Sequence, residues 1–290
     1  MTVVVFGNNY RKETLLQVEI LFRVFQKYEI RVGIESSFYR FLCDDLNFKP
    51  AVSFIFSDDK FDADLALSIG GDGTFLKTAS HIGNKNIPIL GINTGRLGFL
   101  ADISGEEIVS AFEDIMHNRF RIEERTVLQV KTNAMDTVFG YALNEVAVLK
   151  QDSSSMITVR TKLNDELLTD FQSDGLVVST PTGSTAYSMS VGGPLVLPQS
   201  KNLILAAVAP HSLNVRPMVI PDDFRIELEV KSRSECYLIA LDGRSAVFDQ
   251  HTKVLIQKAD FTIKLLKREN YTFYNTLRNK LMWGVDKRTI

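Results

Sequence analysis

The sequence predicts an α/β domain with a parallel sheet and flanking helices, then an all-β domain of the sandwich type, and a last helix that returns to the first domain. Over about the first hundred residues, near-continuous apolar runs alternate with helical patterns, which is typical of a parallel sheet covered by helices. Short β-rich runs without long helical patterns then follow. Near the end, Phe273, Leu277 and Leu281 recur at helical spacing. We assign residues 1–120 and 270–290 to the first domain and 121–269 to the second.

The first domain begins with a β-branched strand at residues 3–6. A hydrophobic pattern predicts an amphipathic helix from about residue 12 to residue 28. The apolar run at residues 65–69 predicts a buried strand, which leads into a glycine loop and a helix that starts at Phe75. Residues 87–92 form another apolar run that also ends in a glycine-rich turn. Ligands of parallel sheets bind beyond the carboxyl ends of the strands, so we expect a ligand at these two loops.

The second domain is recognised from short apolar or alternating runs. Residues 225–230, for example, alternate between apolar and charged side chains, as half-buried antiparallel strands do. The boundary between the domains falls near residues 118–124, and there is no internal repeat or low-complexity linker. The expected strands lie at residues 127–132, 142–149, 157–163, 176–180, 204–208, 225–230, 237–241, 253–257 and 261–266.

Composition places the chain among ordinary globular proteins. Of its 290 residues 45% are hydrophobic and 23% are charged, and the formal net charge is −2, which gives no electrostatic case for binding nucleic acid or an anionic membrane. Cys43 and Cys236 are far apart and belong to no metal-binding or redox motif, so we expect reduced thiols. The first residues lack the features of a signal peptide, and we expect a cytoplasmic protein.

The most informative motif is the Gly-Gly-Asp-Gly-Thr loop at residues 70–74. Glycine has no Cβ, so its backbone N–H groups can approach phosphates closely. A carboxylate among such donors repels phosphate, and Asp72 therefore indicates metal binding or proton removal during phosphoryl transfer. The loop is neither a P-loop nor a dinucleotide fingerprint, because Leu76 stands where each motif needs glycine. The alternative is a turn in which Asp72 caps the following helix.

A second glycine loop, at residues 91–99, strengthens the phosphate hypothesis. Two such loops at neighbouring strand ends can line one cleft, with Arg96 and Lys77 as partners for phosphate charge. The alternative is a pair of surface turns with solvated basic side chains. The four histidines show no metal-ligand spacing and no triad order, and we treat them as structural or surface residues.

The third motif is the Gly-, Ser- and Thr-rich stretch at residues 180–198, together with Asp174-Gly175. Its small polar groups suit the ribose and base edges of a nucleoside, and Tyr187 offers a ring for stacking. An elaborate structural loop is the alternative. Asn144 and Glu145 interrupt the apolar run 142–149, so the inward-facing member of the pair needs a polar partner, either a ribose diol or an internal hydrogen bond.

With these motifs assembled, the chain closely resembles the NAD kinases over nearly its whole length. Loops similar to residues 70–74 also occur in diacylglycerol kinases, sphingosine kinases and phosphofructokinases, whereas residues 181–188 joined to Asn144-Glu145 are more specific to NAD kinases. The resemblance implies transfer of the γ-phosphoryl group of ATP to the 2′-hydroxyl of the adenosine ribose of NAD, which gives NADP. It also implies a divalent cation, with Mg²⁺ expected, and a homodimer or homotetramer.

The resemblance further implies a set of site residues. Asp72 is expected to be the catalytic base, and the remaining residues are expected to contact nucleotide. Gln172 stands where many relatives carry Arg or Lys, so a basic contact to the new 2′-phosphate is missing at that position. The nucleotide-binding set is Asp72, Gly73, Lys77, Asn144, Glu145, Gln172, Asp174, Thr185, Ala186, Tyr187, Ser188, Met189, Ser190 and Arg244, with Asp242 in the same strand–turn segment as Arg244.

Two other functions are consistent with parts of the pattern. A lipid kinase uses the same glycine loop, but it needs an apolar groove where residues 182–190 are polar. A non-catalytic module that senses NAD(H) would bind dinucleotide without forming NADP. The sequence leaves open the phosphoryl donor, the preference between NAD and NADH, and regulation by NADPH.

Overall fold

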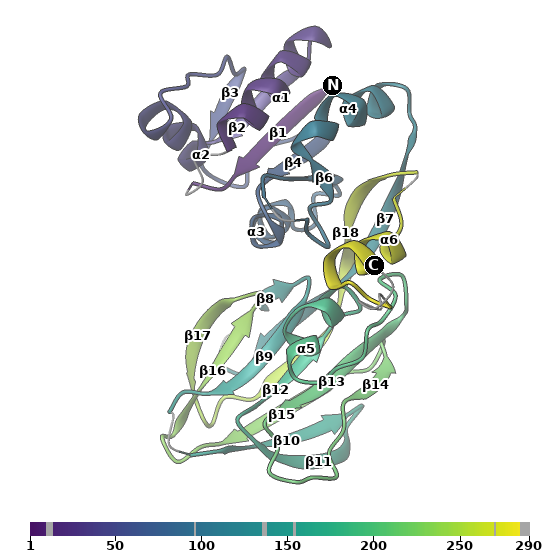
Figure 1. The fold of residues 1–290 in the computed structure, drawn as a ribbon. Coiled ribbons are helices and arrows are strands. Elements are labelled where there is room, and N and C mark those ends of the chain that lie inside the picture. Colours follow the sequence, from purple (N-terminus) through teal and green to yellow (C-terminus); the bar gives the residue numbers. More distant parts are fainter. Residues whose placement is uncertain (10–13, 96, 135–137, 153–154, 270, 285–290) are drawn as a thin grey trace. The chain divides into compact units, whose positions relative to one another are not determined.

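The computed structural model describes residues 1–290 except 10–13, 96, 135–137, 153–154, 270 and 285–290 (Figure 1). The chain forms two compact units. Unit 1 comprises Met1–Glu124 and Ile263–Ile290, and unit 2 comprises Arg125–Thr262. The chain crosses from one unit to the other within two long strands, β7 (Phe120–Thr132) and β18 (Val254–Arg268). Among the described residues, none of the helices has the length and apolar character needed to cross a bilayer.

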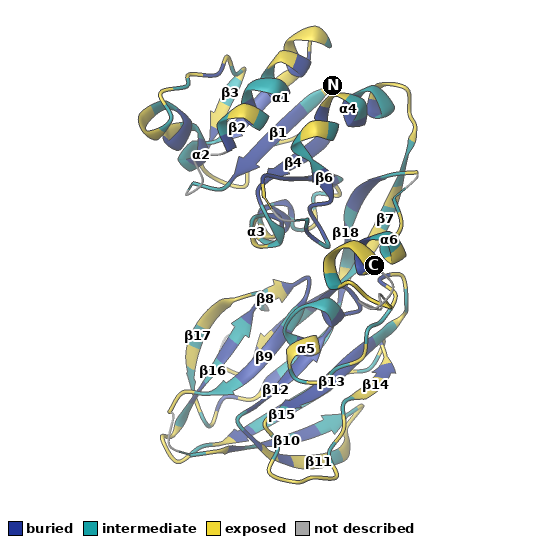
Figure 2. Ribbon diagram, viewed as in Figure 1, coloured by how far each residue is buried: buried dark blue, intermediate teal, exposed yellow. Residues whose placement is uncertain are grey.

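Unit 1 is built on a parallel sheet in the strand order β3-β2-β1-β4-β5, with the short strand β6 beside β5. Every residue of β4 and β5 is buried, which explains their nearly continuous apolar sequences. Strand β4 is dark blue in Figure 2. The predicted parallel sheet is confirmed. The strands are β1 (Thr2–Gly7), β2 (Arg31–Glu35), β3 (Phe54–Phe56), β4 (Leu65–Ile69), β5 (Ile89–Asn93) and β6 (Ile103–Ser104).

The helices of unit 1 cover this sheet with apolar side chains. The core joins buried residues of the strands, such as Val5 and Leu67, to Phe25 and Phe112 of the helices. The helix expected from residue 12 begins at Leu15 in the described part of the chain, and the helix expected from Phe75 begins three residues earlier. The helices are α1 (Leu15–Lys27), α2 (Ser36–Arg40) with a π-helical continuation (Phe41–Asp45), α3 (Asp72–Ile82), α4 (Ile108–Met116) after a 3₁₀ turn (Gly105–Glu107), and α6 (Phe273–Leu281).

Unit 2 is a sandwich of two antiparallel sheets. One sheet has the order β14-β13-β12-β9-β16-β17; in the other, β11-β10-β15 continues to β18, and β7 pairs with β18 and β8. Buried residues from both sheets, such as Val148 and Leu228, form one core, which confirms the predicted sandwich. The remaining strands are β8 (Val138–Ala142), β9 (Glu145–Lys150), β10 (Ile157–Leu163), β11 (Glu166–Ser173), β12 (Gly175–Ser179), β13 (Asn202–Val208), β14 (Met218–Pro221), β15 (Ile226–Lys231), β16 (Cys236–Leu241) and β17 (Arg244–Asp249).

Three of the expected strands are wrong in extent. The run 142–149 is broken into β8 and β9, because the amides of Leu143 and Asn144 bind the carboxylate of Asp242 instead of a neighbouring strand. The runs 253–257 and 261–266 are parts of the single strand β18, because the polar residues between them do not end a strand that has an exposed face.

Candidate functional site

The two glycine loops of unit 1 lie side by side. Strands β4 and β5 are parallel neighbours with Leu67 opposite Leu90 and Ile69 opposite Ile92, so the loops that follow them leave the same edge of the sheet. The amide of Gly70 donates to the carbonyl of Ile92 at 2.9 Å, which joins the bases of the two loops. The sequence-based expectation that both loops meet at the carboxyl ends of neighbouring strands is confirmed.

Asp72 lies in the first turn of α3, where its negative charge is favourable to the helix. Its Oδ2 accepts a hydrogen bond from the amide of Phe99 at 3.0 Å, and its Oδ1 accepts from Leu100 at 2.9 Å and Ala101 at 3.2 Å. A Cβ on Gly98 would lie 2.2 Å from Oδ1, so the close approach of this carboxylate requires glycine there. Asp72 therefore binds the second loop instead of capping its own helix.

A fourth donor reaches Asp72 from the C-terminal helix. The ammonium group of Lys280 on α6 lies 2.9 Å from Asp72 Oδ2 and 4.5 Å from the centre of the Phe99 ring. The Phe99 ring also lies 6.2 Å from the ring of Phe273, so α6 packs against the loop that holds Asp72. This contact confirms the expected return of the last helix to the first domain. Burial by itself raises the pKa of Asp72, but Lys280 and the amides of Phe99 and Leu100 outweigh it and lower that pKa below its ordinary value.

A buried ion pair braces the same loop. The ammonium group of Lys267 lies 2.6 Å from Asp102 Oδ2 and donates to the carbonyl of Leu100 at 3.4 Å. Both side chains are almost fully buried. This ion pair thus holds the loop that supplies the amides to Asp72, and the loop in turn fixes the position of the carboxylate.

Other predicted phosphate contacts of unit 1 are less constrained. Gly73 and Lys77 are exposed on α3. Lys77 contributes to the environment of Glu35, whose pKa burial raises but hydrogen bonds from Ser37 and Phe38 and the charge of Lys77 lower, so that the net shift is downward. Arg96 lies outside the described residues.

In unit 2, a second carboxylate organises the Asn144-Glu145 turn. Asp242 accepts hydrogen bonds from the amides of Leu143 at 2.7 Å, Asn144 at 2.8 Å and Glu145 at 3.1 Å. Burial and the charge of Asp242 raise the pKa of Glu145 to about 7, against a smaller lowering by the amide of Tyr187. Glu145 Oε2 is buried and has no hydrogen-bond partner among the described residues. The turn thus presents a carboxyl group that titrates near neutral pH.

The Gly-, Ser- and Thr-rich stretch folds against this turn. The hydroxyl of Thr180 donates to the carbonyl of Leu143 at 2.6 Å, and its amide donates to the carbonyl of Asn144 at 2.8 Å. A 3₁₀ turn (Thr182–Thr185) and the short helix α5 (Tyr187–Ser190) follow. Sequence motifs about forty residues apart are therefore brought together within unit 2.

The remaining predicted residues of unit 2 fall into an inner group and an outer group. Burial raises the pKa of the Tyr187 hydroxyl, and the charges of Asp174 and Glu145 raise it further, so these three side chains share one region. Asp174 forms an ion pair with Lys150 at 2.8 Å. Ser188 is buried, whereas Thr185 and Ala186 are half-buried. Exposed positions are occupied by Gln172 on β11, by Met189 and Ser190 on α5, and by Arg244 on β17.

Sequence reasoning did not identify Lys280, Lys267 or Asp102 as parts of the site. One signal for Lys280 was present, because it stands three residues after the buried Leu277 and therefore shares a face of α6 with it. In the part of the chain that the structure describes, no three His, Cys, Asp or Glu residues lie close enough together to hold a metal ion.

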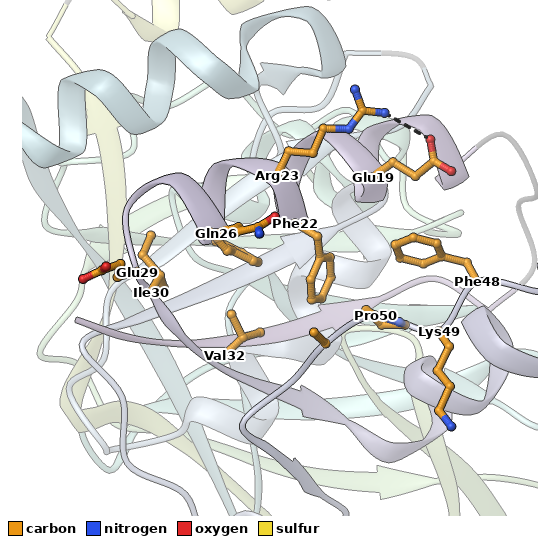
Figure 3. Close-up of a pocket in the computed structure, with 12 residues that line it drawn as sticks. Glu19, Phe22, Arg23, Gln26, Glu29, Ile30, Val32, Phe48, Lys49 and Pro50 are labelled. Atoms are coloured by element: carbon orange, nitrogen blue, oxygen red, sulfur yellow. Dashed lines mark ion pairs between the residues drawn. The ribbon is translucent and has the colours of Figure 1, made fainter.

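A separate cavity of about 690 Å³ lies in unit 1 between α1 and residues 48–51 (Figure 3). Its apolar wall includes Phe22, Ile30 and Val32, and Arg23 at its rim forms an ion pair with Glu19. None of the predicted site residues lines it. This cavity offers no glycine-rich row of amide donors, so it does not share the chemistry of the loops around Asp72.

Comparison with known proteins agrees with both units. Residues 3–120 match the family model for the ATP-NAD kinase N-terminal domain, and residues 143–268 match the model for the ATP-NAD kinase C-terminal domain. An NAD kinase of Bacteroides fragilis is 50% identical over 289 residues, which is 99% of this chain and 100% of the relative. An NAD kinase of Cytophaga hutchinsonii is 43% identical over 293 residues, again 99% and 100%.

Two solved structures have the same fold. A yeast NADH kinase complexed with NADH superposes with a TM-score of 0.89 at 21% identity, covering 100% of this chain and 90% of that protein. An NAD kinase of Archaeoglobus fulgidus in complex with ATP gives a TM-score of 0.74 at 26% identity, with 98% of each chain covered. With full-length relatives of this similarity and both domain models matched, the chain belongs to the NAD kinase family of enzymes.

Proposed function

We propose that this enzyme transfers the γ-phosphoryl group of ATP to the 2′-hydroxyl of the adenosine ribose of NAD and so makes NADP, with Asp72 as the general base. The observation that carries the proposal is the setting of Asp72: three backbone amides and Lys280 hold an ionised carboxylate at the carboxyl edge of a parallel sheet. A carboxylate fixed in this way can align a sugar hydroxyl on phosphorus, once the hydroxyl takes the place of one of these four donors.

The lowered pKa of Asp72 defines how it acts. A carboxylate with a low pKa is ionised at neutral pH but is a weak base, so it removes a proton late, when the oxygen has begun to bond to phosphorus. Phosphoryl transfer proceeds in most analyses through a loose transition state, in which alignment and electrostatics carry most of the catalysis. A positioned general base contributes about 10²–10⁴ in rate.

The predicted nucleotide-binding residues have complementary parts in this proposal. Gly73 and Lys77 on α3 would meet phosphates, Asn144 and Glu145 would hold the adenosine ribose, and Asp174 would contact the dinucleotide. The raised pKa of Glu145 supports its part, because a carboxyl group that titrates near pH 7 can donate to or accept from a sugar hydroxyl. Gln172, Arg244 and the residues Thr185, Ala186, Tyr187, Ser188, Met189 and Ser190 complete the proposed dinucleotide contacts.

The expected divalent cation fits best as part of the ATP substrate. The described residues contain no group of three metal-binding side chains, and amides and Lys280 already occupy the Asp72 oxygens. Mg²⁺ commonly keeps several waters and binds through substrate phosphates with few protein ligands. Mg²⁺ bound to ATP would neutralise phosphate charge, while the protein supplies alignment and the base. We also propose that the enzyme is cytoplasmic and forms a homodimer or homotetramer.

The test is incubation of the purified enzyme with NAD, ATP and Mg²⁺, followed by measurement of NADP and ADP. We expect equal amounts of the two products and a D72N variant that forms NADP about 10²–10⁴ times more slowly. Parallel reactions with NADH and with diacylglycerol test the other acceptors. ADP formation without NADP, or a D72N variant as fast as the wild type, would contradict the proposal.

A further inference from the structure

The hydrogen-bonding capacity of the Asp72 carboxylate is full. A carboxylate offers about four lone-pair positions on its two oxygens. The amides of Phe99, Leu100 and Ala101 take three, and the ammonium group of Lys280 takes the fourth at 2.9 Å from Oδ2. A hydroxyl or a water that gives its proton to Asp72 must therefore first displace one of these donors.

Lys280 is the donor that can leave. The amides belong to a loop that is closed by a hydrogen bond from Gly98 to the carbonyl of Ala101 at 3.0 Å and braced by Lys267. The ammonium group of Lys280 is instead at the end of a long, flexible side chain, 30% of which is exposed. Lys280 itself is one residue before the end of α6. The Phe99 ring already contacts the ammonium group at 4.5 Å, and this cation–π contact does not depend on the bond to Asp72.

We propose that Lys280 determines which acceptor reaches Asp72, by excluding water and yielding to the sugar hydroxyl. Asp72 is 28% exposed at its side chain, so water reaches this region. A water on Asp72 Oδ2 would attack the γ-phosphorus of bound ATP: its oxygen bonds to phosphorus, the bond to ADP breaks, and its proton passes to Asp72. The result is wasteful ATP hydrolysis. This inference rests on the proposed role of Asp72 as the base.

Water and the sugar hydroxyl differ in their ability to displace the ammonium group. The bond between Lys280 and Asp72 is charge-assisted, and such bonds are roughly twice as strong as neutral ones, so water alone displaces it rarely. A bound dinucleotide uses contacts remote from the reacting hydroxyl to drive that hydroxyl into place. The same proton transfer to Asp72 then occurs from the sugar oxygen, which bonds to phosphorus as ADP leaves. Lys280 is thus a specificity-determining positioning residue.

The experiment compares ATP hydrolysis without NAD in the wild type and in K280M. We expect hydrolysis to rise about 10- to 100-fold in K280M, the range expected when a hydrogen bond to a charged group is lost. With NAD present, the amount of ADP formed by K280M should therefore exceed the amount of NADP. K280R keeps the cation and should hydrolyse ATP at the wild-type rate. R278M removes a positive charge from the same helix, but Arg278 bonds Asn275 and not Asp72. R278M should therefore also hydrolyse ATP at the wild-type rate.

Two further variants separate the sources of failure. The double variant D72N/K280M should lose the extra hydrolysis, which excludes a contaminating ATPase. If K280M does not fold, as judged by its melting temperature, K280Q replaces it. Unchanged hydrolysis in a folded K280M or K280Q, together with an inactive D72N, would overturn the inference about Lys280 and leave the proposed base intact. A D72N variant that forms NADP at the wild-type rate would overturn the proposed function itself.

Discussion

Asp72 in unit 1 and Asp242 in unit 2 are built alike. Each carboxylate accepts hydrogen bonds from three consecutive backbone amides, those of residues 99–101 for Asp72 and those of residues 143–145 for Asp242. Their titration nevertheless differs in sign. Burial raises the pKa of Asp242 more than its three amides and Arg244 lower it, whereas Lys280 and the amides lower the pKa of Asp72 despite burial.

The contrast shows that the balance between burial and charged neighbours, and not the amide cradle, sets the chemistry of these two aspartates. Asp72 has an ammonium group on its open side, so the folded chain keeps it ionised. Asp242 stands beside a second carboxyl group, Glu145, and two neighbouring carboxylates are costly to ionise together. Unit 1 thus contains one ready acceptor of a proton, and unit 2 contains a pair of carboxyl groups that shapes a turn.

The largest expected difference between the two aspartates is kinetic. We expect D72N to reduce kcat for NADP formation by about 10²–10⁴, because the amide side chain cannot take the proton of the hydroxyl. We expect D242N to leave kcat within a few-fold but to lower the free energy of unfolding by about 1–3 kcal/mol, because an amide side chain cannot accept all three backbone donors. Steady-state kinetics and urea unfolding of both variants measure the two effects.

The expected pattern is a crossed one, with the kinetic loss in D72N and the stability loss in D242N. In D242N we also expect a higher KM for NAD, because the Asn144-Glu145 turn is no longer held. Equal kinetic losses in both variants would mean that the two carboxylates share one structural function, and the contrast drawn from their neighbours would be wrong.

Gly98 tests how closely Asp72 must be held. A Cβ at this position would lie 2.2 Å from Asp72 Oδ1 and 2.8 Å from the carbonyl oxygen of Ala101, so G98A must move the carboxylate or the loop. A displacement of about 1 Å can cost about 10²-fold in rate, and we expect a loss of that size in kcat.

The double variant D72N/G98A is the control for Gly98. If the added methyl group acts only through Asp72, the double variant should be no slower than D72N. Two substitutions that act through the same side chain do not have additive effects. A double variant that is slower by the full product of the two single losses would show that Gly98 acts independently of Asp72.

The contribution of Glu145 to the free energy of unfolding is expected to depend on pH. Its pKa of about 7 lies above the ordinary 4.5, so between these values the folded chain holds a proton that the unfolded chain has released. The contribution of Glu145 is fully present below about pH 4.5 and is lost as pH rises through 7. We expect a loss of about 2 kcal/mol, less than the full shift implies, because the side chain is only half-buried.

Urea unfolding between pH 4.5 and 8 measures this loss in the wild type against E145Q, which carries no titrating group at the position. E166Q, which removes the same charge from an exposed position on β11, should keep the wild-type pH dependence. If E145Q and the wild type change with pH in parallel, burial beside Asp242 does not control the proton on Glu145.

The elements that surround these aspartates differ in how well the sequence predicts them. Strand β4 and the loop after it are plain in the sequence because every residue of the strand is buried and all but Ser68 are apolar. Strands β2 and β3 and helix α2 are not predicted, because they are short and have polar or mixed patterns. Helix α4 is not predicted either, although its buried residues Ile108, Ala111, Phe112 and Ile115 recur at helical spacing. The break between β8 and β9 depends on Asp242, about a hundred residues away, and no local pattern reveals it.

Distance along the sequence also explains which parts of the site could be predicted. Asp72, Asn144 and Glu145 stand in recognisable motifs, so the sequence identifies them. Their partners stand in no such motif, and Lys280 is 208 residues from Asp72. Lys267 is 165 residues from Asp102. A long-range pair leaves no periodicity in the chain, and only the helical face shared with Leu277 indicated that Lys280 points toward the domain.

Gly73 gives the smallest expected change in stability and tests the glycine loop itself. It lies exposed in the first turn of α3, and a Cβ there would meet nothing within 4 Å. Alanine favours the helix over glycine by up to about 1 kcal/mol, so G73A should be slightly more stable than the wild type. If the backbone at residue 73 approaches a phosphate, the added methyl group should nevertheless raise KM for ATP or lower kcat severalfold. S80A, on the exposed surface of the same helix, should leave both constants unchanged. A G73A variant with wild-type kinetics would mean that nothing in the reaction needs glycine there, and the requirement for close approach would then belong to Gly98 and its contact with Asp72.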